Sequence, residues 1–183
     1  MKRQSIIFLF LIFSPLPSFA QSPYFISLHT GAHVFESNRN IGDTFIPGIG
    51  LGYDFNKRIS AAIRLYTGEY KIQFNKDNET CETETQTGHL LHADIYYRLF
   101  RENLIQPYIT GGLGKFNLSH SKSESLYKED YDEGLLLNYG FGFEFFIENI
   151  SVLADVRHFV AIGIPRNELV FSAGIVFRLP EWE

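Results

Sequence analysis

The chain has 183 residues, of which 45% are hydrophobic and 16% aromatic, and its formal net charge is −5. This length fits a single domain, and the acidic balance gives no electrostatic reason to expect a nucleic-acid partner. Cys81 is the only cysteine, which excludes an intramolecular disulfide and a cysteine-rich metal site.

Residues 1–20 have the pattern of a secretory signal peptide. Two basic residues near the start precede eight consecutive apolar residues at 6–13, and the small residues Ser18 and Ala20 stand where signal peptidase cleaves. The alternative, a membrane anchor, would need about 20 apolar residues. We therefore expect cleavage after Ala20, which leaves residues 21–183 as the mature domain with a formal charge of −7.

Two later segments alternate large apolar residues with small or polar ones. In residues 48–55 the large residues are isoleucine, leucine, tyrosine and phenylalanine, and three glycines and Asp54 stand between them. In residues 135–145 leucine, tyrosine and phenylalanine alternate with asparagine, glycine and glutamate. Successive side chains of a strand point to opposite faces. Because an eight-stranded barrel is only just wide enough inside for its own side chains, the aromatic face is expected to point outward into lipid.

Eight such strands are predicted along the chain. They cover residues 24–35, 45–55, 59–70, 89–99, 106–116, 135–145, 150–159 and 169–179. Each has about the length of a tilted strand that crosses a bilayer, roughly 9–11 residues. An even number of strands is typical of bacterial single-chain barrels. The predicted fold is an all-β, eight-stranded, antiparallel up-and-down transmembrane barrel.

Short and long connections alternate between these strands. The short ones are 56–58, 100–105 and 147–149, and the long ones are 36–44, 71–87, 117–133 and 160–168. Outer-membrane barrels have short periplasmic turns and longer extracellular loops, so the long loops are expected at the cell surface. Loops 71–87 and 117–133 are acidic, which fits either ordinary solvated loops or a surface for a cation or a partner. Cys81 is expected to be a loop thiol, with a reactive or intermolecular role as the alternative.

Three segments resemble the small OmpA-like outer-membrane barrels. Residues 140–152 resemble the sixth and seventh strands of that family, residues 106–114 resemble the fifth, and residues 173–179 resemble the terminal strand signal that the outer-membrane assembly machinery recognises. The resemblance implies a bacterial outer-membrane location, contact with outer-membrane lipid and lipopolysaccharide, and a monomer. It leaves the function open between a structural role, an adhesin-like surface-interaction role with a host or envelope partner at the long loops, and a narrow pore.

The alternation also predicts which charged residues lie inside the barrel. They are four acids and four arginines: Asp54, Arg64, Asp94, Arg98, Glu144, Asp155, Arg157 and Arg178. Unpaired buried charges are costly, so these groups are expected to pair. Arg98 or Arg178 is the expected partner of Glu144, because Arg157 lies further from the short turn at 147–149. The charges could line a gated ion path, or they could form a sealed polar core, which the narrow interior favours.

An enzyme is the second class of function to consider. Lipid A deacylases are also membrane barrels, with a His-x-Ser pair and a nearby glutamate on the outer wall. The corresponding positions here are His158, Val160 and Glu168, and valine has no hydroxyl with which acyl transfer could start. HExxH, a phosphate loop and GxSxG do not occur in the sequence. A non-enzymatic barrel without a cofactor or metal is therefore predicted.

Overall fold

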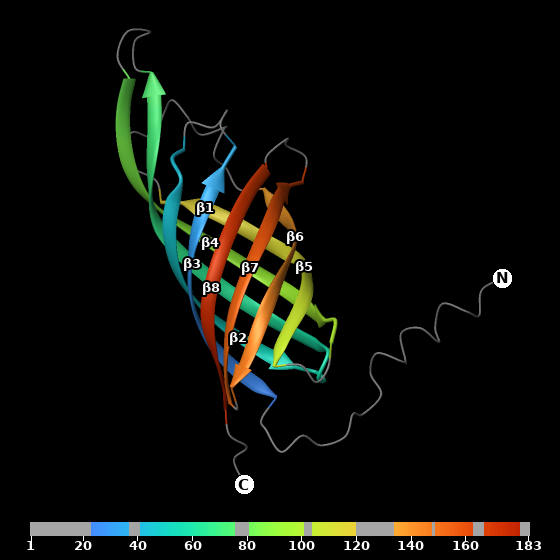
Figure 1. Ribbon diagram of the computed structural model, residues 1–183. Helices are drawn as coiled ribbons and strands as arrows, with labels where there is room; N and C mark the ends of the chain where they lie inside the picture. Colours follow the sequence, from blue (N-terminus) through green and yellow to red (C-terminus); the bar gives the residue numbers. More distant parts are fainter. Residues whose placement is uncertain are drawn as a thin grey trace, which may run out of the picture.

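A computed structural model describes residues 23–36, 41–75, 81–100, 104–119, 134–147, 149–162 and 167–179. They form eight strands: β1 (Tyr24–Phe35), β2 (Thr44–Asp54), β3 (Ile59–Asn75), β4 (Cys81–Arg98), β5 (Ile105–Leu118), β6 (Leu135–Ile147), β7 (Ile150–Ala161) and β8 (Asn167–Arg178). Each strand pairs antiparallel with the next, and β8 pairs with β1, so the sheet closes into a barrel (Figure 1). The predicted fold class is confirmed. The predicted signal peptide lies outside the described residues.

The two ends of the barrel differ. The short connections after β2, β4 and β6 define what we call the turn end, and the opposite end is the loop end (Figure 1). Both described termini lie at the turn end, where Asp54 N donates to Pro23 O at 2.7 Å and Leu179 N donates to Tyr24 O at 3.0 Å. No helix in the described residues is long and apolar enough to cross a membrane.

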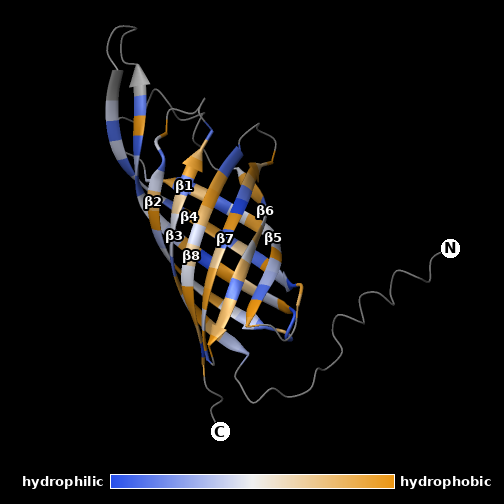
Figure 2. Ribbon diagram, in the orientation of Figure 1, coloured by the Kyte–Doolittle hydropathy of each residue, from blue (hydrophilic) through white to orange (hydrophobic). Residues whose placement is uncertain are grey.

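The outer wall of the barrel is apolar and the inner wall is polar. Along β1, exposed and buried residues alternate almost without interruption. Large hydrophobic side chains cover the outside, with Phe45 68% exposed and Phe143 53% exposed. Figure 2 shows hydrophobic and hydrophilic residues following each other along the strands. Glu144, next to Phe143 in β6, is buried. This distribution fits a barrel whose outer face lies in lipid.

The hairpin of β3 and β4 is longer than predicted and rises above the other strands at the loop end (Figure 1). β3 has 17 residues and β4 has 18, and the register continues to Asn75 opposite Cys81. The prediction of a loop is therefore wrong for residues 71–75 and 81–87, including Cys81, and residues 76–80 lie outside the described residues. Residues 83–87 alternate threonine with glutamate and glutamine, so no apolar face marks them, although β-branched threonine favours an extended backbone.

Smaller corrections concern the other strand ends. β2 begins at Thr44 and ends at Asp54, one residue earlier at each end than predicted, and β8 likewise runs one to two residues earlier, over Asn167–Arg178. β5, β6 and β7 each extend about two residues beyond the predicted end. Most of the second acidic loop, residues 120–133, lies outside the described residues.

Glycine at position 112 lets the wall of β5 approach its neighbour. A Cβ atom at Gly112 would overlap the carbonyl oxygen of Ala93 in β4, whereas a Cβ at the adjacent Gly111 would meet only the carbonyl oxygen of Asn138, at 3.6 Å. We expect Gly112→Ala to lower the free energy of unfolding by about 1–3 kcal/mol, because the added methyl group forces the strands apart. Gly111→Ala is the matched control, with an expected change within about 0.5 kcal/mol.

Urea titration of both variants refolded in lipid vesicles measures this difference. Equal unfolding midpoints for the two variants would contradict this prediction, because they would show that β4 and β5 accommodate the added methyl group at Gly112 with no loss of stability.

Candidate functional site

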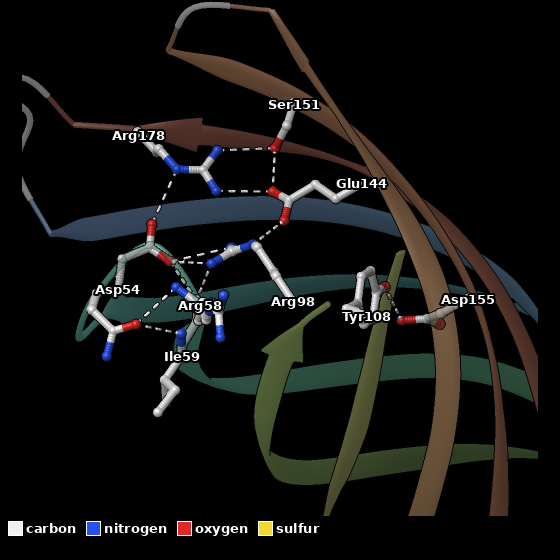
Figure 3. A network of polar contacts seen from close by, with 11 residues as sticks. Asp54, Arg58, Ile59, Arg98, Tyr108, Glu144, Ser151, Asp155 and Arg178 are labelled. Atoms are coloured by element: carbon white, nitrogen blue, oxygen red, sulfur yellow. Dashed lines mark hydrogen bonds and ion pairs between the residues drawn. The ribbon is translucent and has the colours of Figure 1, made fainter. Parts of the chain in front are cut away.

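Four charged side chains form a closed ring inside the barrel near the turn end. They come from the four even-numbered strands: Asp54 from β2, Arg98 from β4, Glu144 from β6 and Arg178 from β8. Glu144 lies 2.9 Å from Arg98 Nε and 2.8 Å from Arg178 Nη2. Asp54 lies 3.2 Å from Arg98 Nη2 and 3.0 Å from Arg178 Nε (Figure 3). Each acid thus contacts both arginines, and this turn-side quartet has no net charge.

The remaining donors of these arginines also have partners in the interior. Arg178 Nη1 donates to Ser151 Oγ at 3.0 Å, and Arg98 Nη1 donates to Ser60 Oγ at 2.7 Å. The guanidinium of Arg178 also lies over the ring of Phe146, 4.6 Å from its centroid. Both arginines are therefore held in one position by several strands at once, which favours a rigid ring.

A second group of four charges lies in the middle of the barrel. Arg64 from β3 reaches across to Asp155 on β7, with 3.1 Å between Nη1 and Oδ2. Arg157, also on β7, lies 2.8 Å from the same carboxylate and donates through Nη1 to Asp94 on β4. All four side chains are at most 2% exposed. This central quartet is also neutral, so no uncompensated charge remains among these eight interior groups.

Asp155 is the centre of this second group. In addition to its two arginines, its carboxylate accepts hydrogen bonds from the hydroxyl of Tyr108 at 2.9 Å and from Ser172 Oγ at 2.5 Å. Figure 3 shows the Tyr108 contact. One carboxylate therefore links β3, β5, β7 and β8, which cover opposite sides of the barrel.

The interior toward the loop end is mostly apolar, and among the described residues it encloses a polar group of three side chains. His33 Nε2 lies 2.9 Å from Glu168 Oε2, and His33 Nδ1 lies 3.0 Å from the hydroxyl of Tyr70. The surrounding residues form what we call the loop-end plug: Phe35, Ile41, Ile46, Tyr66, Tyr70, Ile72, Leu90, Phe116, Leu136, Phe159, Ala161 and Val170. His33 packs edge-on against Phe116 at 5.3 Å between ring centroids. The plug thus covers the central quartet from the loop end.

The eight charged residues named from the sequence all lie inside the barrel, and Asp54 is the most exposed of them, at 18% of its side chain. Glu144 contacts Arg98 and Arg178 rather than Arg157. His33 and Tyr70, which form a polar group with Glu168, are not among the residues predicted from the sequence. The alternation of β1 does indicate that His33 points into the barrel, because His33 is in step with the other buried residues of that strand.

The structure separates the residues that a deacylase would need to bring together. His158 lies on the outer wall, where its Nδ1 is 2.6 Å from the hydroxyl of Tyr139. Glu168 points to the inside and is 3% exposed, although its strand pairs with that of His158. Glu168, the position that corresponds to the deacylase glutamate, therefore lies on the opposite face of the wall from His158, because β8 begins at Asn167 and directs Glu168 inward. The described residues also contain no group of three or more histidine, cysteine or acidic side chains that could hold a metal ion.

Comparisons with known proteins agree with this architecture. The sequence model described as "Outer membrane protein beta-barrel domain" matches residues 6–177. Among solved structures, Neisserial surface protein A is 15% identical with a TM-score of 0.64, covering 88% of this chain and 100% of its own. OprG from Pseudomonas aeruginosa is 11% identical with a TM-score of 0.61, covering 88% and 98%.

A third similar structure is Ail, the attachment invasion locus protein of Yersinia pestis, in complex with the heparin analogue sucrose octasulfate. It is 14% identical with a TM-score of 0.56 and covers 87% of this chain and 99% of its own. At these identities the likeness shows a shared fold. A comparison with curated protein sequences finds no match.

Proposed function

The chain belongs to the outer membrane protein β-barrel domain family, and we propose that it is a sealed barrel that acts by binding a partner at the cell surface. The observation that carries the proposal is the filling of the interior. From the turn end to the loop end, the interior is crossed by the turn-side quartet, the central quartet and the loop-end plug. The barrel then serves as a rigid support for what projects from its loop end.

An ion that crossed this interior would have to disrupt each of the three groups. The two quartets hold eight charges in neutral pairs, so opening a path would leave buried charges without partners. The plug contains Tyr66, Phe159 and Val170, each at most 1% exposed, and it would have to move as a unit. These costs favour a closed interior over the narrow pore that is the alternative.

The loop end supports the surface-binding part of the proposal. The β3–β4 hairpin extends the barrel wall beyond the other strands (Figure 1), which presents side chains and backbone to whatever lies outside the membrane. The fold of this chain is also that of Ail, which is named as an attachment invasion locus protein. The likeness is one of fold alone, and the acidic balance of this chain gives no electrostatic reason to expect that it binds the heparin analogue.

Planar-bilayer recording tests the sealed interior. The purified protein is expected to insert without discrete conductance steps, since no continuous polar path crosses the plug. Glu144→Gln is the comparison, because it removes one charge of the turn-side quartet while keeping its shape. Conductance steps in the original protein that change in size in Glu144→Gln would identify a narrow pore and overturn the proposal.

Adherence tests the surface-binding part. Ile72 lies opposite Glu84 in the register, so residues 73–83 can be replaced by an Asn-Gly turn that joins β3 to β4 directly and keeps Ile72 in the loop-end plug. Proteoliposomes with the intact protein are expected to bind immobilised host-matrix or bacterial envelope proteins, and those with the trimmed variant are not. Equal binding by the two proteins would show that the hairpin is not the binding surface. Absence of binding by both would overturn the surface-binding role.

A further inference from the structure

Asn138 is a buried amide side chain without a hydrogen-bond partner. It lies on β6, faces the inside of the barrel and is 1% exposed. Neither its side-chain oxygen nor its side-chain nitrogen has a partner among the described residues. Buried amide groups in folded proteins are almost always hydrogen-bonded, because an enclosed polar group without a partner costs free energy. Both polar atoms of this side chain therefore need a partner other than the side chains around them.

Asp94 on β4 has an acceptor that matches this amide. The hydrogen bonds of its carboxylate all go to Oδ2: His92 Nδ1 lies at 2.6 Å, the Tyr96 hydroxyl donates at 3.3 Å, and Arg157 Nη1 also donates. Oδ1 has no partner among the described residues, although Asp94 is only 3% exposed. The central quartet thus contains one buried carboxylate oxygen that its own members leave unused.

Asp94 and Asn138 lie on the two sides of a glycine. The register sets Asp94 opposite Gly112 of β5, and it sets Gly112 opposite Asn138 of β6. A Cβ atom at Gly112 would lie 2.5 Å from Asp94 Oδ1, so this oxygen lies over the inner face of the glycine, toward β6. Because Gly112 has no side chain, no side chain of β5 stands between the two polar groups in this row.

The gap between the two groups suits one small bridging molecule. Backbones two strands apart are separated by two strand spacings, roughly 9–10 Å. The short side chains of Asp94 and Asn138 close part of this gap without meeting, since neither is a partner of the other. A water molecule that makes one hydrogen bond on each side spans roughly 5 Å between its partner atoms.

The loop-end plug encloses this position. The residue opposite Asn138 on β7 is Phe159, which is 0% exposed, and the next inward residue of β6 toward the loop end is Leu136, which is 4% exposed. Both belong to the plug. A molecule held between Asp94 and Asn138 would therefore exchange slowly with the water outside the barrel.

The charge balance selects a neutral occupant. Arg64 and Arg157 already balance Asp94 and Asp155 in the central quartet. A cation at Asp94 Oδ1 would add an uncompensated charge beside two arginines. Water adds no charge, donates one proton to Asp94 Oδ1, and has a further proton and two lone pairs for the amide of Asn138.

We propose that Asp94 Oδ1 and the side chain of Asn138 form a binding site for an ordered water molecule over Gly112. The water joins β4 to β6, a strand that the direct contacts of the central quartet do not reach. Glycine at 112 then has two roles, since it allows the close approach of β4 and leaves room for the water. The site is independent of the surface-binding role and of the experiments that test it.

Nuclear magnetic resonance tests the site in the intact protein. The protein is labelled with heavy-nitrogen asparagine and placed in lipid nanodiscs, and the Asn138 side-chain signal is assigned by its loss in Asn138→Leu. Its amide protons are expected to show cross-peaks to water, with the opposite NOE and ROE signs of a long-lived bound molecule. Asn56, in the short turn after β2, is the control and is expected to show no such signal. Absence of the cross-peak at Asn138 would overturn the proposal.

Asn138→Leu is a second test, because the sign of its effect depends on the water. Leucine has nearly the shape of asparagine and no polar atom. With water bound, the substitution removes hydrogen bonds and leaves Asp94 Oδ1 less well satisfied, so the ratio of folded to unfolded protein in urea titration is expected to fall about tenfold. In a dry site the substitution would remove two unpaired polar atoms and raise this ratio. A rise would overturn the proposal.

Asn138→Gln is the matched control for that substitution. Glutamine keeps an amide that can bond to the water or to Asp94, so this variant is expected to lose clearly less stability than Asn138→Leu. An equal loss in the two variants would show that packing, and not hydrogen bonding, determines the effect, and it would overturn the proposal.

A change of salt separates water from a bound cation. Replacing sodium chloride by choline chloride at equal ionic strength is expected to leave the urea midpoint of the original protein unchanged, because choline is too large to enter and water needs no ion. A fall in the midpoint that Asn138→Leu does not show would identify a cation at Asp94 Oδ1 and overturn the assignment to water.

Discussion

Asp155→Ala is expected to lower the free energy of unfolding by about 3–5 kcal/mol, the cost of leaving a buried charge without its partner. Asp155 is the carboxylate that both Arg64 and Arg157 contact. Without it the central quartet has one acid and two arginines, and Arg64 loses its acidic partner. Urea titration in lipid vesicles, followed by the fraction of folded protein that migrates differently on unheated gels, measures the loss.

A double variant distinguishes charge balance from the simple loss of contacts. Arg64→Met combined with Asp155→Asn removes one charge of each sign and keeps the pair of Arg157 with Asp94. The double variant is expected to lose less stability than the sum of its two single variants, since neutrality is restored. A cost below about 1 kcal/mol for Asp155→Ala would mean that water screens the interior charges, and would count against a sealed barrel.

The division of residues between the inside and the outside of the barrel follows from the sequence with little ambiguity. The period of two assigns each residue of a strand to a face, so Glu144 and its neighbour Phe143 had to lie on opposite sides of the wall. Closure then places every polar face in one interior. The partner of Glu144 also follows from the sequence, because distance from the turn at 147–149 separates it from Arg157.

The grouping of the charges into two quartets could not be predicted in the same way. Arg64 and Asp155 meet across the barrel, from β3 to β7, and which side chains share a level depends on the stagger of the strands. The sequence carries no local signal for that stagger. For the same reason the sequence does not predict the contact of His33 with Glu168, two residues that are 135 positions apart.

The projecting hairpin was missed for a different reason. A strand outside the membrane has water on both faces, so its sequence needs no apolar alternation. Thr83 and Thr85 mark it only through their β-branched side chains. Membrane-crossing strands are therefore easier to find in this chain than the strand segments that extend beyond them.

Phe143→Arg is expected to prevent most of the protein from assembling in the membrane. The side chain of Phe143 is 53% exposed on the outer wall, and its neighbours in the register are Pro107 and Ala154, which offer no charge or hydrogen bond. Arginine that faces lipid costs roughly 2–4 kcal/mol near the middle of the bilayer. Insertion into vesicles, scored as the folded fraction on unheated gels, is expected to fall severalfold.

Phe143→Leu is the matched control, because leucine keeps an apolar side chain on the same strand and is expected to assemble normally. The comparison tests the surroundings of the outer wall directly, since both substitutions remove the same aromatic ring. If Phe143→Arg assembled as well as Phe143→Leu, the residue would not face lipid. A shift of the β6 register by one residue would then be the simplest explanation, as it exchanges every inward side chain for an outward one, and it would place Phe143 rather than Glu144 among the arginines of the turn-side quartet.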